Sequence, residues 1–141
     1  MLSAGRIVLR LAIRRQERAM LYAILCYNNE AAVCGLSPEE DAKMMAGVRR
    51  AEEKILERGK FGPRLRLMPT TAATFVKAGK DPLVIDGPFA ETKEQLLGFW
   101  IIECDSLEDA IEAGKHLARE REYGGIEVRP ISAYNPPGVQ D

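Results

Sequence analysis

The fold is decided by one stretch of the chain, residues 96–104, which read LLGFWIIEC. The run is apolar almost throughout, which is typical of a strand inside a sheet that is covered on both faces. Successive side chains of a strand point to opposite faces, so Phe99 and Trp100 must find cover on different sides. The sequence therefore predicts a central strand here, with a second sheet face that also needs covering.

A helix and a last strand are predicted downstream of this run. Ser106 is expected to cap a helix, with Asp109 three positions later as the acid of a capping box. Apolar and small residues form the expected inner stripe of that helix: Leu107, Ala110, Ile111, Gly114 and Leu117. Gly124 and Gly125 then break the chain before a strand at 126–131.

A strand and a helix are also predicted upstream. The apolar residues 21–27 form the first strand, which ends near a loop at 28–30. Residues 37–40 read SPEE and predict a helix start with a serine cap, a proline in the first turn and a glutamate that completes a capping box. That helix is expected to run to Arg58, with Gly59 as its stop. Its expected buried stripe is Met45, Val48, Ala51, Ile55 and Leu56.

Extended segments connect the upstream helix to the central strand. In residues 61–68 leucine alternates with arginine, which predicts a strand with one solvated face. Residues 71–77 and 82–85 are predicted to pair as a hairpin around a turn at 78–81. Residues 86–94 are expected to form a turn followed by one helical turn.

The predicted order is strand, helix, strand, hairpin, strand, helix, strand. Two βαβ-like halves within about 110 residues predict an α+β protein with a ferredoxin-like plait. Helices cover one sheet face in that arrangement, so the other face needs a different partner. We expect a homodimer whose two sheets pack face to face.

Composition excludes several classes of protein. The chain has 141 residues, of which 46% are hydrophobic and 29% charged, as in ordinary globular domains. A net charge of −1 argues against a strongly basic nucleic-acid binder and against an acidic disordered chain. Apolar runs fall short of the ~18 residues that a membrane-spanning helix needs. We expect a cytoplasmic protein with neither nucleic acid nor membrane as its partner.

Residues 1–19 differ in charge from the rest of the chain. They carry five arginines and one glutamate, a net charge of +4, which leaves −5 on residues 20–141. Three interpretations remain open for this basic tail: a transit-type presequence, a helix that lies on a membrane surface, or a mis-assigned start with translation beginning at Met20. We expect the folded domain to span 20–132 and a flexible tail to follow at 133–141.

The chain lacks the usual signatures of metal and cofactor sites. Its three cysteines, Cys26, Cys34 and Cys104, form no Cys-x-x-Cys pair, and Cys26 and Cys104 lie in predicted strands. The single histidine, His116, cannot form a two-histidine metal site and is expected to be a solvated or half-buried helix residue. Phosphate-binding loops, dinucleotide fingerprints and serine nucleophile elbows are also missing, so we expect no cofactor.

Carboxylates are the remaining candidates for chemistry. Asp86 ends an apolar strand before Gly87, where it either closes a turn or lies at a pocket mouth as a general acid or base. Glu91 either joins Asp86 as a second carboxylate, pairs with Lys93, or favours a helix N-terminus. Tyr22 and Arg64 are candidates for lining the pocket, and each is equally explained as a strand residue with its polar end in water.

Several segments resemble one known family. Residues 86–95 read DGPFAETKEQ, which resembles the signature of the DGPF branch of the YciI-like proteins. Residues 20–25, 36–40, 104–110 and 126–131 also fit that family, in the same order. The resemblance implies a ferredoxin-like fold and a dimeric α+β barrel. It implies little about the reaction, because the family is largely uncharacterised, although enzymatic roles around a His/Asp-type pocket have been proposed for it.

The sequence departs from the family at one position that matters for catalysis. Many relatives carry a histidine in the first helix, whereas residues 44–50 read MMAGVRR here. Two classes of function therefore stay open. One is a small cofactor-free enzyme that uses Asp86 for acid or base chemistry on a small organic molecule. The other is a non-catalytic dimeric protein that binds a ligand or serves as an accessory.

Overall fold

The computed structural model describes residues 20–138, and within them the chain forms two antiparallel sheets and three helices. The elements in order are β1 (Met20–Asn29), α2 (Glu30–Cys34), α3 (Pro38–Ile55), β2 (Gly59–Arg66), the 3-10 turn η1 (Thr70–Ala72), β3 (Thr74–Lys77), β4 (Leu83–Asp86), β5 (Glu94–Cys104), α4 (Leu107–Ala118) and β6 (Gly125–Pro130). The predictions for the basic tail lie outside the described residues.

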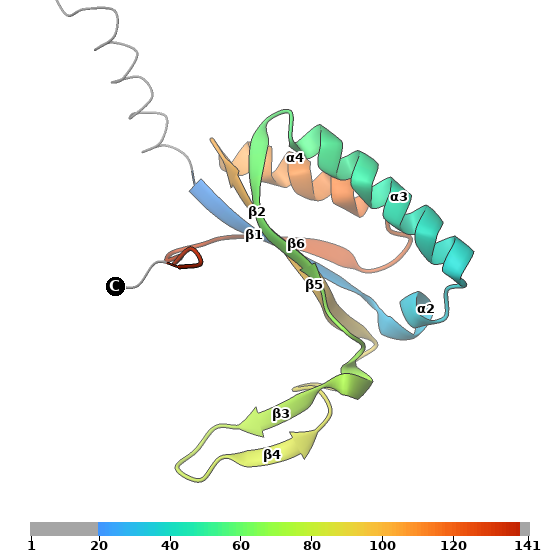
Figure 1. Cartoon of the computed structure of the whole chain (residues 1–141), viewed down its shortest axis with the longest axis vertical. Coiled ribbons are helices and arrows are strands. Elements are labelled where there is room, and N and C mark those ends of the chain that lie inside the picture. Colours follow the sequence, from blue (N-terminus) through green and yellow to red (C-terminus); the bar gives the residue numbers. More distant parts are fainter. Residues whose placement is uncertain (1–19, 139–141) are drawn as a thin grey trace, which may run out of the picture.

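The main sheet has the strand order β2-β5-β1-β6, and α3 and α4 lie on one side of it (Figure 1). Each neighbouring pair in this sheet is antiparallel. The predicted α+β class is therefore confirmed, and the order of strands and helices is compatible with a ferredoxin-like plait. None of the helices in the described range is long and apolar enough to cross a bilayer.

β5 is an interior strand, as predicted, and it carries much of the core. Trp100 and Ile102 are buried on the side of the helices. They pack in one cluster with Tyr22, Ile24, Cys26, Val48, Ala51, Ile55, Cys104, Ala110, Ala113 and Leu117. Phe99 alternates with these residues and is only half-buried. The helices thus cover one face of β5, and the cover predicted for its other face is incomplete in the single chain.

The open face of the main sheet is largely apolar. Along β1, β2 and β5 it presents Leu21, Ala23, Leu25, Leu65, Phe99 and Ile101, whereas Glu103 of β5 and Glu127 and Arg129 of β6 place charges on the same face. Leu25 and Leu65 both lie opposite Phe99, and Ala23 lies opposite Ile101. Ile101 is buried, whereas the other members are half-buried or exposed. The expected second layer is therefore not supplied by the described part of this chain.

Both predicted serine caps are present, but the predicted capping box forms only at Ser37 and not at Ser106, where the Asp109 carboxylate lies 3.8 Å from Arg58 instead. Ser37 Oγ accepts a hydrogen bond from the Glu40 N–H at 3.1 Å, and Glu40 Oε1 accepts one from the Ser37 N–H at 3.1 Å. Ser106 Oγ accepts from the Asp109 N–H at 3.1 Å. α3 ends at Ile55 rather than Arg58, because the N–H groups of Glu57 and Arg58 donate to carbonyls three residues back and tighten the last turn.

The short helix α2 replaces the start of the loop predicted after β1. Asn29 caps it by accepting a hydrogen bond from the Ala32 N–H at 2.9 Å, and Gly35 follows its last residue. Glu30 then ties this helix to a distant segment. Its carboxylate accepts from the Thr70 N–H at 3.0 Å and from the Thr70 hydroxyl, and its N–H donates to the Lys93 carbonyl at 3.3 Å.

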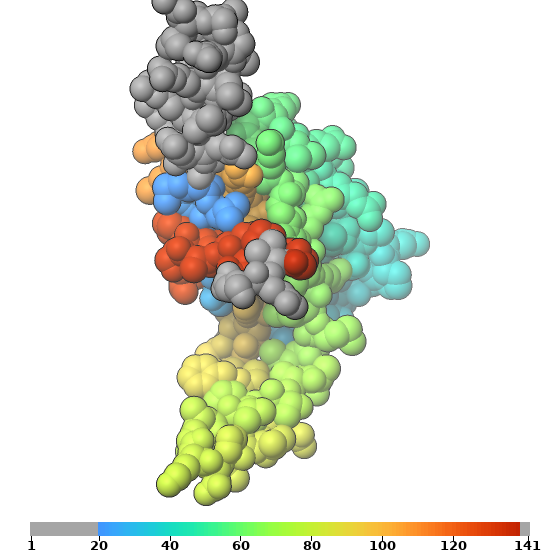
Figure 2. Space-filling model, turned by 60° about the vertical axis from the view of Figure 1, so that its left-hand side comes forward, coloured from blue at the N-terminus to red at the C-terminus, as the bar shows by residue number. Residues whose placement is uncertain are grey.

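Residues 70–93, which we call the arm, extend away from the main sheet (Figures 1 and 2). β3 and β4 pair as the predicted hairpin, but β3 begins at Thr74 because Thr70–Ala72 form a 3-10 turn. The helical turn predicted within 86–94 is wrong, since that stretch is irregular until β5 begins. Large apolar side chains are exposed along the arm: Val76, Leu83, Val84, Ile85 and Phe89.

Candidate functional site

A cavity on the helix side lies between α3 and the sheet, and we call it the α3 cavity. Its volume is about 220 Å³. Four helical positions, seven strand positions and one residue that follows α4 line it: Cys26, Val33, Met45, Val48, Glu52, Arg64, Leu65, Arg66, Leu97, Gly98, Trp100 and Arg121. Most of these side chains are apolar and a few are charged, which is the usual composition of a small-molecule site.

Gly98 sets how closely β2 approaches β5 beside the cavity. A Cβ atom built on Gly98 would lie 2.3 Å from the Leu65 carbonyl oxygen, so no larger residue fits without moving β2. The missing side chain also leaves space next to Trp100, which is the only tryptophan of the chain and is 8% exposed. The cavity wall is therefore shaped by a backbone contact as well as by side chains.

Two ion pairs connect α3 to β2 at the cavity. Arg64 pairs with Glu52, and its guanidinium carbon lies 5.0 Å from the centroid of the Phe61 ring. Arg66 makes two hydrogen bonds to Asp41, with Nη2 donating to Oδ1 at 2.8 Å and Nη1 donating to Oδ2 at 3.3 Å. The hydrogen bond from Arg66 lowers the pKa of Asp41 and raises the pKa of Arg66 itself.

A third arginine, Arg121, lines the cavity without such a pair. It follows α4, and its backbone N–H donates to the Ala118 carbonyl at 3.0 Å. Its Nη1 donates to the Met44 sulfur at 3.3 Å, and a thioether is only a weak acceptor. Its Nε is buried without a hydrogen-bond partner, and the ion pairs found in residues 20–138 do not include Arg121.

The cavity also contains a thiol, Cys26, which is 2% exposed. Burial raises the pKa of Cys26, and the positive charge of Arg121 offsets part of that effect. Cys104 lies elsewhere in the core, and burial is the main reason that its pKa rises to about 11. Both thiols thus stay protonated at neutral pH and serve as packing residues, in agreement with the structural role expected for them.

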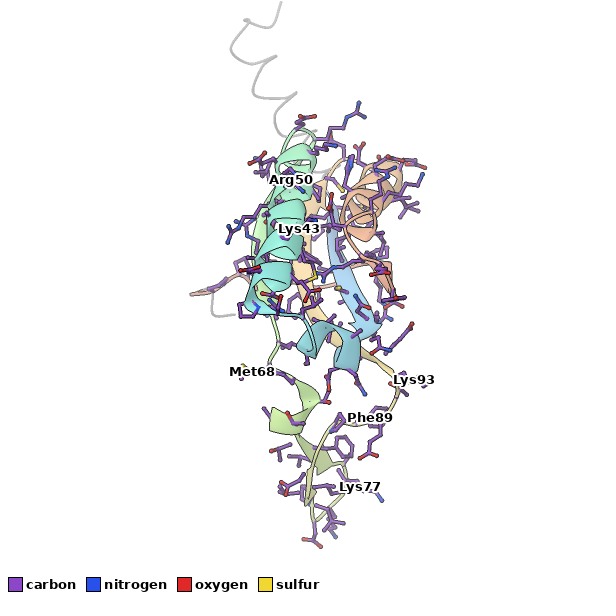
Figure 3. The ribbon with its side chains drawn as sticks, turned by 90° about the vertical axis from the view of Figure 1, so that its right-hand side faces the viewer. Lys43, Arg50, Met68, Lys77, Phe89 and Lys93 are labelled. Atoms are coloured by element: carbon purple, nitrogen blue, oxygen red, sulfur yellow. The ribbon has the colours of Figure 1, made fainter. Side chains whose placement is uncertain are left out.

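The structure places the predicted site residues in separate regions. Arg64 lines the α3 cavity. Tyr22 is 2% exposed in the core, where its hydroxyl lies 3.8 Å from the Met20 sulfur and burial raises its pKa. Asp86 and Glu91 are exposed on the arm, and Glu91 lines an open depression of about 500 Å³. Figure 3 shows the separation, with Phe89 on the arm and Lys43 on α3.

Residues that sequence reasoning did not select complete the cavity. The sequence did indicate Arg66 as a cavity residue, because the alternation of leucine and arginine puts it on the same face of β2 as Arg64. The signal for Glu52 was weaker: it lies one helical turn after Val48, a predicted inner position of α3. Arg121 had none, since it lies in the turn after a helix, where a basic residue is ordinary.

The remaining polar candidate is isolated from the cavity. His116 is half-buried on α4, as expected, and its Nδ1 lies 3.2 Å from Arg119 Nη1. Among residues 20–138 there is no group of three His, Cys, Asp or Glu side chains that is arranged to hold a metal ion.

Comparison with known proteins identifies the family. The model of the YCII-related domain matches residues 20–135, which include every element from β1 to β6. The chain is also similar to an uncharacterised protein of Rhizobium meliloti (strain 1021), with 46% identity over 119 residues. That match covers 83% of this chain and 96% of the relative. The chain therefore belongs to the family of YCII-related domain proteins.

Proposed function

We propose that this chain binds a small organic molecule in the α3 cavity and does so as a homodimer of the DGPF branch of the family. The observation that carries the proposal is the cavity itself, with about 220 Å³ of space between a buried tryptophan and three arginines. A space of this size, lined mostly by apolar side chains with a few charged groups, suits a small organic molecule.

The open face and the arm support the homodimer. The open face presents apolar side chains that the helices do not cover, and the arm adds Val84 at 70% exposure and Phe89 at 84%. Exposed apolar patches of this kind mark interaction surfaces. A second copy packed sheet to sheet would cover both and would give the dimeric α+β barrel that the family resemblance implies.

A second candidate function is acid or base catalysis by Asp86. The observation in its favour is the setting of Asp86 on the arm, next to Ile85 and close in sequence to the exposed Phe89. Val84, which is 70% exposed, lies on the same face of β4 as Asp86, so a second copy that covers Val84 also desolvates the Asp86 carboxylate, and a desolvated carboxylate is suited to proton transfer. The first candidate is preferred because its cavity is already formed in the single chain.

A ligand screen with two matched variants tests the proposed function. Val33→Phe places a ring in the cavity, whereas Ala32→Phe adds the same ring at an exposed position of the same helix. Small organic acids, amides and alcohols are screened by thermal shift against all three proteins. Ligands that stabilise the wild type and Ala32→Phe but not Val33→Phe support the proposal. Stabilisation that Val33→Phe leaves unchanged contradicts it.

A further inference from the structure

The charges that line the α3 cavity do not balance. Arg64 and Arg66 each have a carboxylate partner, Glu52 and Asp41 respectively. Arg121 contributes a third positive charge, and no carboxylate of the described residues pairs with it. The three arginines of the cavity and the two carboxylates that pair with them, Glu52 and Asp41, therefore carry one excess positive charge together.

The Arg121 side chain is held at the cavity but is poorly satisfied there. A guanidinium has five N–H donors, and the hydrogen bond found from this one goes to the sulfur of Met44. The buried Nε has no acceptor at all. A buried donor that lacks an acceptor costs more free energy when it belongs to a charged group than when it belongs to a neutral one. A ligand that offers an acceptor to Arg121 is therefore stabilised by a correspondingly large amount.

We propose that the α3 cavity selects small monocarboxylates, with Arg121 binding the carboxylate and the apolar wall around Trp100 and Val48 binding a short hydrocarbon body. This inference rests on the proposed function, because it names the ligand class of the same cavity. A planar carboxylate matches the forked donors of a guanidinium. A single negative charge matches the single excess positive charge, whereas a doubly charged phosphate leaves an uncompensated charge beside apolar walls.

Trp100 provides a direct readout for the test. It lines the cavity and is the only tryptophan of the chain, so a change in its fluorescence reports an event at the cavity. Hexanoate and its neutral analogue hexanamide are titrated into the full-length protein at neutral pH. Both probes are nearly equal in size and neither absorbs where tryptophan is excited. We expect hexanoate to bind at least about tenfold more tightly than hexanamide, as for a charge-assisted hydrogen bond in place of a neutral one.

Two arginine variants localise the effect. Arg121→Met keeps an unbranched side chain but removes the charge and the N–H donors, and we expect it to abolish the preference for hexanoate over hexanamide. Arg119→Met is the matched control, since Arg119 lies two residues away against His116 and does not line the cavity. It should keep the wild-type preference.

The outcomes separate this inference from the function on which it rests. A hexanoate preference that Arg121→Met removes and Arg119→Met keeps supports the carboxylate site. Equal binding of hexanoate and hexanamide to the wild type overturns the carboxylate site but leaves a cavity that binds small molecules. This wild-type comparison decides the matter even if Arg121→Met does not fold. Failure of both probes, together with an empty thermal-shift screen, overturns the proposed function itself.

Discussion

The two faces of the main sheet are covered in very different ways. On the helix side, α3 and α4 bury a continuous apolar cluster in which Ile24 is 0% exposed. On the open face, Leu25 and Phe99 stay half-buried, and the arm beyond them exposes five large apolar side chains. The difference teaches that the helix-side layer is complete within a single chain, whereas the open face is the surface on which we propose that a second copy packs. Four predictions test this contrast.

The largest effect is expected in the helix-side core. Ile24→Ala removes a fully buried side chain, so the free energy of unfolding should fall by about 2–5 kcal/mol. Val84→Ala on the arm shortens a side chain that is 70% exposed and should cost less than about 0.5 kcal/mol when the protein is dilute enough to be monomeric. Urea denaturation of both variants measures the difference. Equal losses in the two variants would remove the contrast between the regions.

The next effect concerns self-association. Leu25→Glu places a charge in the middle of the open face, and burying that charge unpaired in a dimer interface is costly. We expect the dissociation constant of the homodimer to rise at least about 100-fold, measured by analytical ultracentrifugation. Ile111→Glu is the control, because Ile111 is exposed on α4 on the other side of the sheet. A wild-type protein that is monomeric at high micromolar concentration would refute the dimer.

A smaller effect is expected where β2 meets β5. Gly98→Ala puts a Cβ atom 2.3 Å from the Leu65 carbonyl oxygen, so β2 has to move, at a cost of about 1–3 kcal/mol. The same movement distorts the α3 cavity and should weaken any ligand that binds there. Gly125→Ala meets no atom within 4 Å and should be nearly neutral. Thermal denaturation and ligand titration of both variants provide the measurement, and an unperturbed Gly98→Ala would argue against this packing.

The smallest effect is the pH dependence of the Arg66–Asp41 pair. The folded-state pKa of Asp41 is lowered by Arg66, so the pair stabilises the fold above the ordinary pKa of 3.8 and loses that contribution as the pH falls through the lower folded-state value. Because both side chains are partly exposed, the contribution at neutral pH should be about 1 kcal/mol or less. We expect Arg66→Met to be slightly less stable than wild type at pH 7 and equal to it near pH 2 by urea denaturation. If the difference in unfolding free energy between Arg66→Met and wild type persists near pH 2, the lost stability comes from packing rather than from the ion pair.

Much of the fold was predictable from local signals, because apolar runs and caps act within a few residues. The LLGFWIIEC strand, the Ser37 capping box and the hairpin turn at 78–81 all depend on such signals. The helix α2 also carried signals in Asn29 and Gly35, but its five residues are too few to show a helical period. The helical turn expected after Pro88 is absent, and other contacts hold that stretch: the Phe89 ring packs against Phe75 with centroids 5.4 Å apart, and Gln95 Nε2 donates to the Ala90 carbonyl at 2.6 Å.

The site was less predictable because distant segments build it. Arg64 was selected from its strand pattern, and it does line the cavity. Arg121 enters the cavity only because α4 packs beside α3, a contact that no local pattern reveals. The roles suggested for Asp86 and Glu91 depend on what covers the arm, and they stay predictions.

The most direct test of the account is amide chemical-shift mapping with the best ligand from the thermal-shift screen. The account predicts that the largest shifts fall on residues that line the α3 cavity, such as Val48, Gly98, Trp100 and Arg121. Largest shifts on the arm, around Asp86 and Glu91, would contradict it and would make Asp86 the centre of function.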